Sequence, residues 1–234
     1  MTNRILRTAF VGSALAGCIV GQATGQISGT VADETGAPVA SAYVTYLRTP
    51  YTSKDTVPIG GGQYTTKAGQ FSFTGLIPAT YAFCVQTEPD RGYVPVCDWT
   101  YTPPSTRLTA GLSTKVNITI QHGRRIELRM KDAGGLLPTP EDKAPSSFVV
   151  FGVRSADGRL HSAQIRSRDP GGHDYWVIVP ANQVMQVSVF GSNHAFQDTN
   201  GADVALNAAG LSIPAGLAGS VNRLQFTTVK AKVP

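Results

Sequence analysis

The stretches GQISGTVADETGAPVASAYVTY (residues 25–46) and GQFSFTGLIPATYAFCV (residues 69–85) decide the fold. In both, apolar or small residues occupy every second position and polar residues lie between them. A period of two puts one set of side chains in a core and the other set outside, so these segments are predicted to be short β-strands. The inward positions are Ile27, Gly29, Val31, Ala42, Val44, Tyr46, Phe71, Phe73, Tyr81, Phe83 and Val85.

Breaks in the pattern fall at residues 33–36 (DETG), at Gly60–Gly61–Gly62 and at Pro78. Glycine allows the positive φ angles of turns, and proline cannot donate to a strand ladder. Several short strands at this spacing predict an all-β chain folded as an antiparallel β-sandwich.

These residues also carry a family resemblance. Gly29-Thr30-Val31, residues 33–36, Gly69-x-Phe71-x-Phe73 and Tyr81, with Pro38-Val39, Ala42 and Leu76, resemble the carboxypeptidase regulatory-like domain. The resemblance covers residues 26–121 and implies a transthyretin-like, seven-stranded sandwich of the carbohydrate-binding-like fold. It implies little about function, because the domain is an accessory module in many unrelated proteins. Residues 49–66 are longer and more polar than the family's usual connection. We interpret them as a solvated insertion, with a binding loop as the alternative.

The second half repeats the β pattern. Strands are predicted at residues 116–120, 126–130, 148–153, 175–179 and 185–189, with turns at residues 157–158, 169–172 and 200–201. Asp-Gly and Asn-Gly are strong signals for two-residue hairpins. RIELRMKDAGG (residues 125–135) echoes VADETG. We therefore predict two sandwiches in tandem, residues 24–121 and 122–234, although a hairpin at His122–Gly123 within one domain would give the same pattern.

The first residues predict export. Arg4 and Arg7 precede the small and apolar run of residues 8–20, as in a signal peptide of residues 1–23. Two ways of processing remain open: cleavage after Ala23, or lipidation of Cys18 in the lipobox-like LAGC, which would give an outer-membrane lipoprotein. No other apolar run is long enough for a membrane helix. The expected location is periplasmic, cell-surface or secreted.

Cys84 and Cys97 are predicted to form a structural disulfide, because an even pair in an exported chain is most simply a bridge. No Cys-x-x-Cys or His-x-x-x-His pattern lies nearby, so no metal site is expected there.

Catalytic motifs are absent from the sequence. The four histidines occur in HGRR, HSAQ, HDYW and HAFQ, and none begins a His-x-x-Glu zinc motif. Neither a Gly-x-Ser-x-Gly elbow nor a phosphate loop occurs. The net charge of +5, which falls to +3 without Arg4 and Arg7, is too small to indicate nucleic acid. We expect no enzymatic activity and no cofactor. Residues 198–203 have a calcium-loop composition, but a hairpin turn is the preferred interpretation.

Aromatic residues supply the ligand-site hypothesis. Tyr93, Trp99 and Tyr101 share one alternation face with Cys97 and could stack on sugar rings. The alternative, which we favour, is that the rings pack on the disulfide. Residues 173–176 (HDYW) follow two glycines and could present an aromatic ring to a ligand, but we interpret Trp176 as a core residue. Arg124, Arg125, Arg129 and Lys131, with Glu127 among them, are interpreted as a solvated strand face.

The leading hypothesis is a non-enzymatic, exported binding or scaffolding module of the bacterial envelope, with polysaccharide or envelope proteins as partners. Carbohydrate is the first ligand class to test, by analogy with the fold. The alternatives are an accessory component of a larger outer-membrane or transport assembly and, third, an unrecognised hydrolase.

Overall fold

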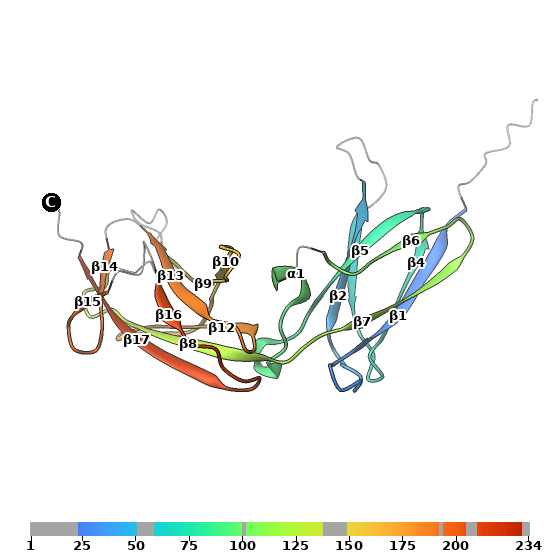
Figure 1. Ribbon diagram of the computed structural model, residues 1–234. Helices are drawn as coiled ribbons and strands as arrows, with labels where there is room; N and C mark the ends of the chain where they lie inside the picture. Colours follow the sequence, from blue (N-terminus) through green and yellow to red (C-terminus); the bar gives the residue numbers. More distant parts are fainter. Residues whose placement is uncertain are drawn as a thin grey trace, which may run out of the picture.

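The computed structural model describes residues 23–50, 59–99, 102–137, 149–191, 194–204 and 210–230, and these residues form an all-β protein (Figure 1). Short helical turns, η1 (Pro89–Arg91) and α1 (Val96–Trp99), interrupt the strands. None of the helices in the described ranges has the length and hydropathy of a membrane span. The strands are β1 (Gly25–Ala32), β2 (Tyr43–Thr49), β3 (Gly60–Tyr64), β4 (Gln70–Leu76), β5 (Ala79–Gln86), β6 (Ser105–Leu108), β7 (Ser113–Thr119), β8 (Gly123–Lys131), β9 (Val149–Arg154), β10 (Leu160–Ser162), β11 (Gln164–Asp169), β12 (Gly172–Pro180), β13 (Met185–Gly191), β14 (His194–Gln197), β15 (Asp203–Val204), β16 (Leu211–Ile213) and β17 (Val221–Lys230).

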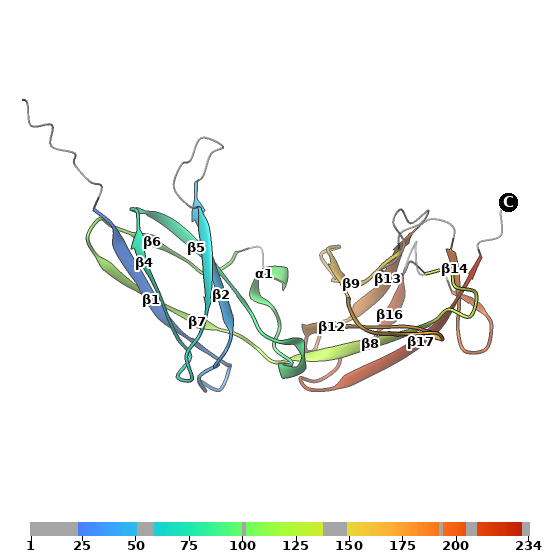
Figure 2. The same ribbon diagram turned by 180° about the vertical axis from the view of Figure 1, so that it is seen from behind.

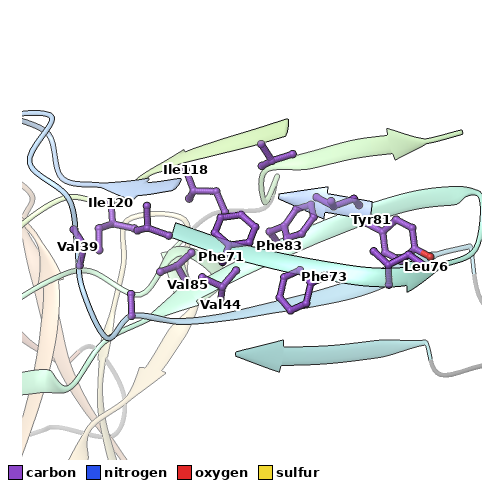
Figure 3. Packing of buried hydrophobic residues seen from close by; sticks show 14 of the residues in the cluster. Val39, Val44, Phe71, Phe73, Leu76, Tyr81, Phe83, Val85, Ile118 and Ile120 are labelled. Atoms are coloured by element: carbon purple, nitrogen blue, oxygen red, sulfur yellow. The ribbon is translucent and has the colours of Figure 1, made fainter. Parts of the chain in front are cut away.

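The first sandwich consists of a β4-β1-β7 sheet packed on a β3-β2-β5-β6 sheet. Apart from Gly29, every inward position predicted from the two opening stretches belongs to the first hydrophobic cluster or packs against it. Their side chains interdigitate between the two sheets, as Figure 3 shows for Phe71, Phe73 and Phe83. Phe73 and Phe83 stack with ring centroids 6.5 Å apart. Burial of these rings removes a large apolar area from water and is the main force that holds the sheets together.

Gly29 shows why the sequence needs a small residue in the middle of β1. This strand lies between β4, which is antiparallel to it, and β7, which is parallel to it. A Cβ atom on Gly29 would lie 1.7 Å from the carbonyl oxygen of Val116 and 2.8 Å from the Phe71 ring. Glycine at this position therefore permits the close approach of β1 to β7.

The second sandwich pairs a β10-β9-β13-β16 sheet with a six-stranded β11-β12-β8-β17-β14-β15 sheet. It has a hydrophobic cluster of its own, which includes Met130, Phe151 and Phe226. The first cluster ends at Ile120 and the second begins at Ile126. The change from one core to the other lies close to the predicted boundary at residues 121–122.

The two sandwiches repeat one topology. β1 and β8 each pair antiparallel with one strand (β4 or β12) and parallel with the last strand of the sandwich (β7 or β17). The facing sheets, β3-β2-β5-β6 and β10-β9-β13-β16, have the same order in equivalent strands. The second sandwich adds β11, β14 and β15 to this plan. The prediction of antiparallel sheets did not include the two parallel pairs. Each of them forms because the first strand of a sandwich lies beside its last strand, β1 beside β7 and β8 beside β17.

The echo between the two halves in the sequence corresponds to the same turn in both sandwiches. The amide of Gly36 donates to the Asp33 carbonyl oxygen at 3.0 Å, and that of Gly135 donates to the Asp132 carbonyl oxygen at 3.1 Å. Each aspartate is buried, and its carboxylate accepts backbone N–H groups of the next few residues. An aspartate followed by a glycine with positive φ thus closes the first strand in each half.

The predicted break at Gly60–Gly62 is wrong, because these residues begin strand β3. Their missing side chains make room for tyrosine rings of β2. A Cβ on Gly62 would lie 2.6 Å from the Tyr43 hydroxyl, and one on Gly61 would lie 3.0 Å from the Tyr46 ring. The glycines here serve packing between strands rather than a turn.

Candidate functional site

The predicted disulfide between Cys84 and Cys97 is confirmed, with Cα atoms 5.3 Å apart. Cys84 lies in β5 and Cys97 in the short helix α1. The closed loop between them contains η1, and Gly92 ends this helical turn in the left-handed region at φ 73°. The bridge attaches α1 to the β3-β2-β5-β6 sheet of the first sandwich.

The predicted alternation of Tyr93, Trp99 and Cys97 along one strand face is wrong. The segment folds into two helical turns instead, so the spacing of these residues does not follow a strand period. Pro89 at the start of η1 and Pro95 before α1 both favour such turns. Tyr101 and Cys18 lie outside the described residues.

Trp99 lies on the second sandwich, although α1 belongs to the first. Its ring packs against the second hydrophobic cluster and stacks on the imidazole of His161 in β10, with centroids 3.5 Å apart and planes inclined by 12°. Figures 1 and 2 show α1 facing the second sandwich, on the side where β10 and β12 lie. Helix α1, which the disulfide attaches to β5, thus carries an aromatic ring from the first sandwich to the second.

Tyr93 packs against the first hydrophobic cluster, close to the chain crossing between the sandwiches. Its ring lies 4.1 Å from that of His122, and the Arg91 guanidinium lies 5.4 Å from its centroid. Burial is the largest influence on its hydroxyl and raises the pKa of Tyr93. The favoured interpretation was that these rings pack on the disulfide. The ring contacts of Tyr93 and Trp99 are instead with the imidazoles of His122 and His161.

A pocket of about 460 Å³ nevertheless opens between the sandwiches at these rings. The first sandwich supplies one wall from the end of β5 and the disulfide-closed loop, and β10, β11 and β12 supply the other. We call it the interdomain pocket. Its lining residues are Gln86, Thr87, Pro89, Tyr93, Pro95, Asp98, Trp99, Arg159, Leu160, His161, Ser162, Gln164, Trp176, Val177 and Ile178.

Trp176 is buried, as expected, with 8% of its surface exposed, but the second hydrophobic cluster does not include it. It lies on the outer face of β12, between positions that face the core. The guanidinium groups of Arg125 and Arg166 lie 5.5 Å and 5.2 Å from its ring centroid. Both arginines also contact Glu127, so cation–π contacts and ion pairs cover the ring together.

Arg124 corrects the interpretation of the arginine cluster as a solvated face. It is fully buried, donates to the Asn222 side chain at 2.8 Å and to the Gln183 carbonyl oxygen at 2.7 Å, and burial lowers its pKa. Arg125 and Arg129 do lie on the outer face, paired with Glu127 and with Asp169 and Asp174. The alternation of β8 turns Arg124 inward and its neighbour outward.

The polar groups that lie near the interdomain pocket are grouped around His161. Burial, as the largest cause, and the nearby Arg159 lower the pKa of this imidazole. Its Nε2 lies 3.3 Å from the Ser155 hydroxyl, and this hydroxyl also donates to the Asp157 carboxylate. In a catalytic triad the carboxylate orients the imidazole instead. Ser155 and Asp157 here close the β9–β10 turn.

Residues 198–203 form a turn, as the hairpin interpretation expects. The carboxylate of Asp198 accepts the amides of Asn200 at 2.8 Å and Ala202 at 2.9 Å, which is the hydrogen bonding of a hairpin turn. Within the residues that the structure describes, there is no group of three or more His, Cys, Asp or Glu residues with the geometry of a metal site.

Comparisons with known proteins give fold-level likeness only. No protein-family model and no curated protein matches the chain, so membership of the carboxypeptidase regulatory-like family is not shown. Among solved structures, a Streptococcal ancillary pilin is 13% identical over 88% of this chain and 62% of its own, with a TM-score of 0.42. The Bacillus anthracis TIE protein is 10% identical over 88% and 34%, with a TM-score of 0.35. The 3-chlorocatechol 1,2-dioxygenase of Rhodococcus opacus is 15% identical over 44% and 61%, with a TM-score of 0.32. The chain spans less than two thirds of each of these proteins, and TM-scores this low carry no statement about function.

Proposed function

We propose that this chain is a non-enzymatic, exported binding or scaffolding module of the bacterial envelope that binds a saccharide in the interdomain pocket. The observation that carries the proposal is that Tyr93 and Trp99, both only partly buried, line one hollow between two sandwiches. Small-molecule sites occur preferentially at domain interfaces, and the pocket's volume of about 460 Å³ lies in their usual range.

The chemistry of the lining suits a sugar. Aromatic rings offer flat apolar surfaces with little conformational entropy to lose, and the apolar faces of pyranose rings pack on such surfaces. Gln86, Gln164 and Ser162 place uncharged donors and acceptors on the rim, and the exposed Asp98 adds a carboxylate. Hydroxyl groups of a sugar both donate and accept, so an amide-rich rim matches them.

Export is supported by the signal-like residues 1–23 and by the Cys84–Cys97 bridge, because disulfides persist in oxidising compartments. The seven strands of the first sandwich agree with the resemblance to the carboxypeptidase regulatory-like domain. Accessory modules of this kind bind or space other components, which fits a scaffold with no catalytic part of its own.

The absence of catalysis is part of the proposal. The Ser155 hydroxyl directs its proton to Asp157, so the contact with His161 does not activate a nucleophile. His161 is also occupied by the stack on Trp99, which fixes the imidazole as a wall of the pocket.

A glycan array with fluorescently labelled protein tests the proposal. We expect binding to a restricted set of glycans, weakened at least about tenfold in Tyr93→Ala and Trp99→Ala because each loses a ring surface worth about 0.5–1.5 kcal/mol beyond its buried area. Leu112→Ala, at an exposed apolar residue away from the pocket, is the matched control and keeps wild-type binding. No binding above background by the folded wild-type protein refutes the saccharide assignment. Hydrolysis of any arrayed glycan by the wild type refutes the non-enzymatic part.

A further inference from the structure

We propose that the outer face of the β4-β1-β7 sheet is a second binding site, which takes an extended neutral polysaccharide. The site is separate from the interdomain pocket and does not depend on it. We call it the neutral face, and it consists of the outward residues that alternate with the buried ones on these strands: Gln26, Ser28, Thr30, Gln70, Ser72, Thr74, Ser113, Lys115, Asn117 and Thr119.

The charge of this face is the first argument. Among its ten residues, only Lys115 is charged. The second sandwich provides an internal comparison, because its β12-β8-β17 strands occupy the equivalent positions. The outward residues there include Asp174, Arg125, Glu127, Arg129, Lys131 and Arg223. The equivalent sheet of the second sandwich therefore accommodates many charged residues. The near absence of charge on the neutral face is thus a property of that surface and is not imposed by the fold.

The order of the polar groups is the second argument. The strand register sets rows across the sheet, Ser72–Ser28–Lys115 and Gln70–Thr30–Asn117. The side-chain amide of Gln26 donates to the Ser72 hydroxyl at 2.7 Å, and the Thr30 hydroxyl donates to Asn117 Oδ1 at 3.0 Å. These bonds hold the side chains in place, so less conformational entropy is lost when they bind. Amides and hydroxyls offer donors and acceptors without charge, as neutral sugar hydroxyls require.

An exposed ring at the rim is the third argument. Tyr64 at the end of β3 is 65% exposed and packs at 4.9 Å from the Tyr43 ring, which orients it. The neighbouring Gln63 donates to the Ser72 carbonyl oxygen at 2.6 Å and attaches this end of β3 to β4. Tyr64 and the polar rows line one shallow hollow of about 630 Å³. A ring beside an ordered array of uncharged polar groups is suited to stacking one sugar while its neighbours are hydrogen-bonded.

Native gels that contain a soluble polysaccharide test this site. The probes are the neutral polymers hydroxyethyl cellulose, galactomannan and soluble starch, with alginate as an anionic polymer. Two variants remove different features: Tyr64→Ala removes the ring, and the pair Ser28→Asp with Asn117→Asp adds charge. The pair Gln225→Asp with Thr227→Asp adds the same two charges to the equivalent sheet of the second sandwich as the matched control, and Trp99→Ala reports on the interdomain pocket.

We expect at least one neutral polymer to retard the wild-type protein and alginate to retard it less. Tyr64→Ala weakens this binding about tenfold and the charged pair on the neutral face abolishes it, whereas the control pair on the second sandwich and Trp99→Ala leave it unchanged. Thermal unfolding checks that each variant is folded. The inference is overturned if no neutral polymer retards the protein, if alginate retards it more, or if both neutral-face variants bind like the wild type. Loss of binding in Trp99→Ala alone assigns the polymer to the pocket and also overturns the neutral face, whereas failure of the glycan-array test leaves these gels unaffected.

Discussion

Removal of the Cys84–Cys97 bridge is the perturbation whose magnitude follows most directly from the structure. The bridge closes a loop with a sequence separation of 13. The loop-closure entropy for this length corresponds to about 3 kcal/mol of stabilisation at 25 °C, because the unfolded chain gains this freedom when the bridge is absent. Both cysteines are half-buried, so Cys84→Ala with Cys97→Ala leaves little cavity and isolates the effect of the bridge.

Hydrogen exchange resolved by peptide mass spectrometry measures this loss where it occurs. We expect the amides of β2 and β5 in the first core to exchange about a hundredfold faster, the equivalent of about 3 kcal/mol. The amides of β8 and β12 in the second core keep their protection, because the bridge lies in the first sandwich. Wild-type protein in dithiothreitol is the matched control and reproduces the variant's pattern. A loss below about 1 kcal/mol in β2 and β5, or an equal loss in β8 and β12, refutes this reasoning.

Three further predictions concern the fold. Gly29→Ala destabilises the protein by at least about 3 kcal/mol in urea unfolding, because its Cβ would meet the Val116 carbonyl oxygen at 1.7 Å. Gly134→Ala, where the nearest atom is a leucine side chain at 3.4 Å, changes the stability little. Equal effects of the two substitutions would contradict the account of β1. Asp132→Ala lowers the free energy of unfolding by about 1–3 kcal/mol, because it leaves the amides of Leu136 and Leu137 without their acceptor. Asp132→Asn recovers part of this loss. An unchanged free energy of unfolding in Asp132→Ala would contradict the role of this turn. Burial lowers the pKa of His161 and of His173, so the unfolded chain binds more protons than the folded chain below the ordinary histidine pKa of about 6.5. The free energy of unfolding therefore falls as the pH drops from 7 towards 5. Urea midpoints that stay level or rise as the pH drops would contradict this prediction.

The strands of the first sandwich could be predicted because one of its faces is buried and the other is solvated. Alternation in residues 25–46 and 69–85 records that difference directly. Strand β3 was missed because Gly60–Gly62 has the composition of a turn, and only the tyrosine rings of β2 explain it. Strand β17 was not predicted. Its parallel pairing with β8 joins residues that are far apart in the sequence, and no local pattern reports such a pairing.

The candidate site was half predictable. Tyr93 and Trp99 were proposed from a strand alternation with Cys97 that the structure does not contain, yet both line the interdomain pocket. His161 and Trp176 were missed as partners because they come from the second sandwich, and no local pattern reports how two domains face each other. Polar Asp174 two residues before Trp176 indicates the outer face of β12, and that alternation was the available signal.

Tryptophan fluorescence tests the central claim most directly. The chain contains two tryptophans, Trp99 and Trp176, and both line the interdomain pocket, so its intrinsic emission reports this site. The protein is titrated with a panel of soluble neutral and acidic oligosaccharides. A saccharide that enters the pocket is predicted to give a saturable change in emission, which Tyr93→Ala weakens and Tyr64→Ala leaves intact. Emission that stays constant with every oligosaccharide, in protein shown to be folded, would contradict the claim that the pocket between the two sandwiches is a saccharide site.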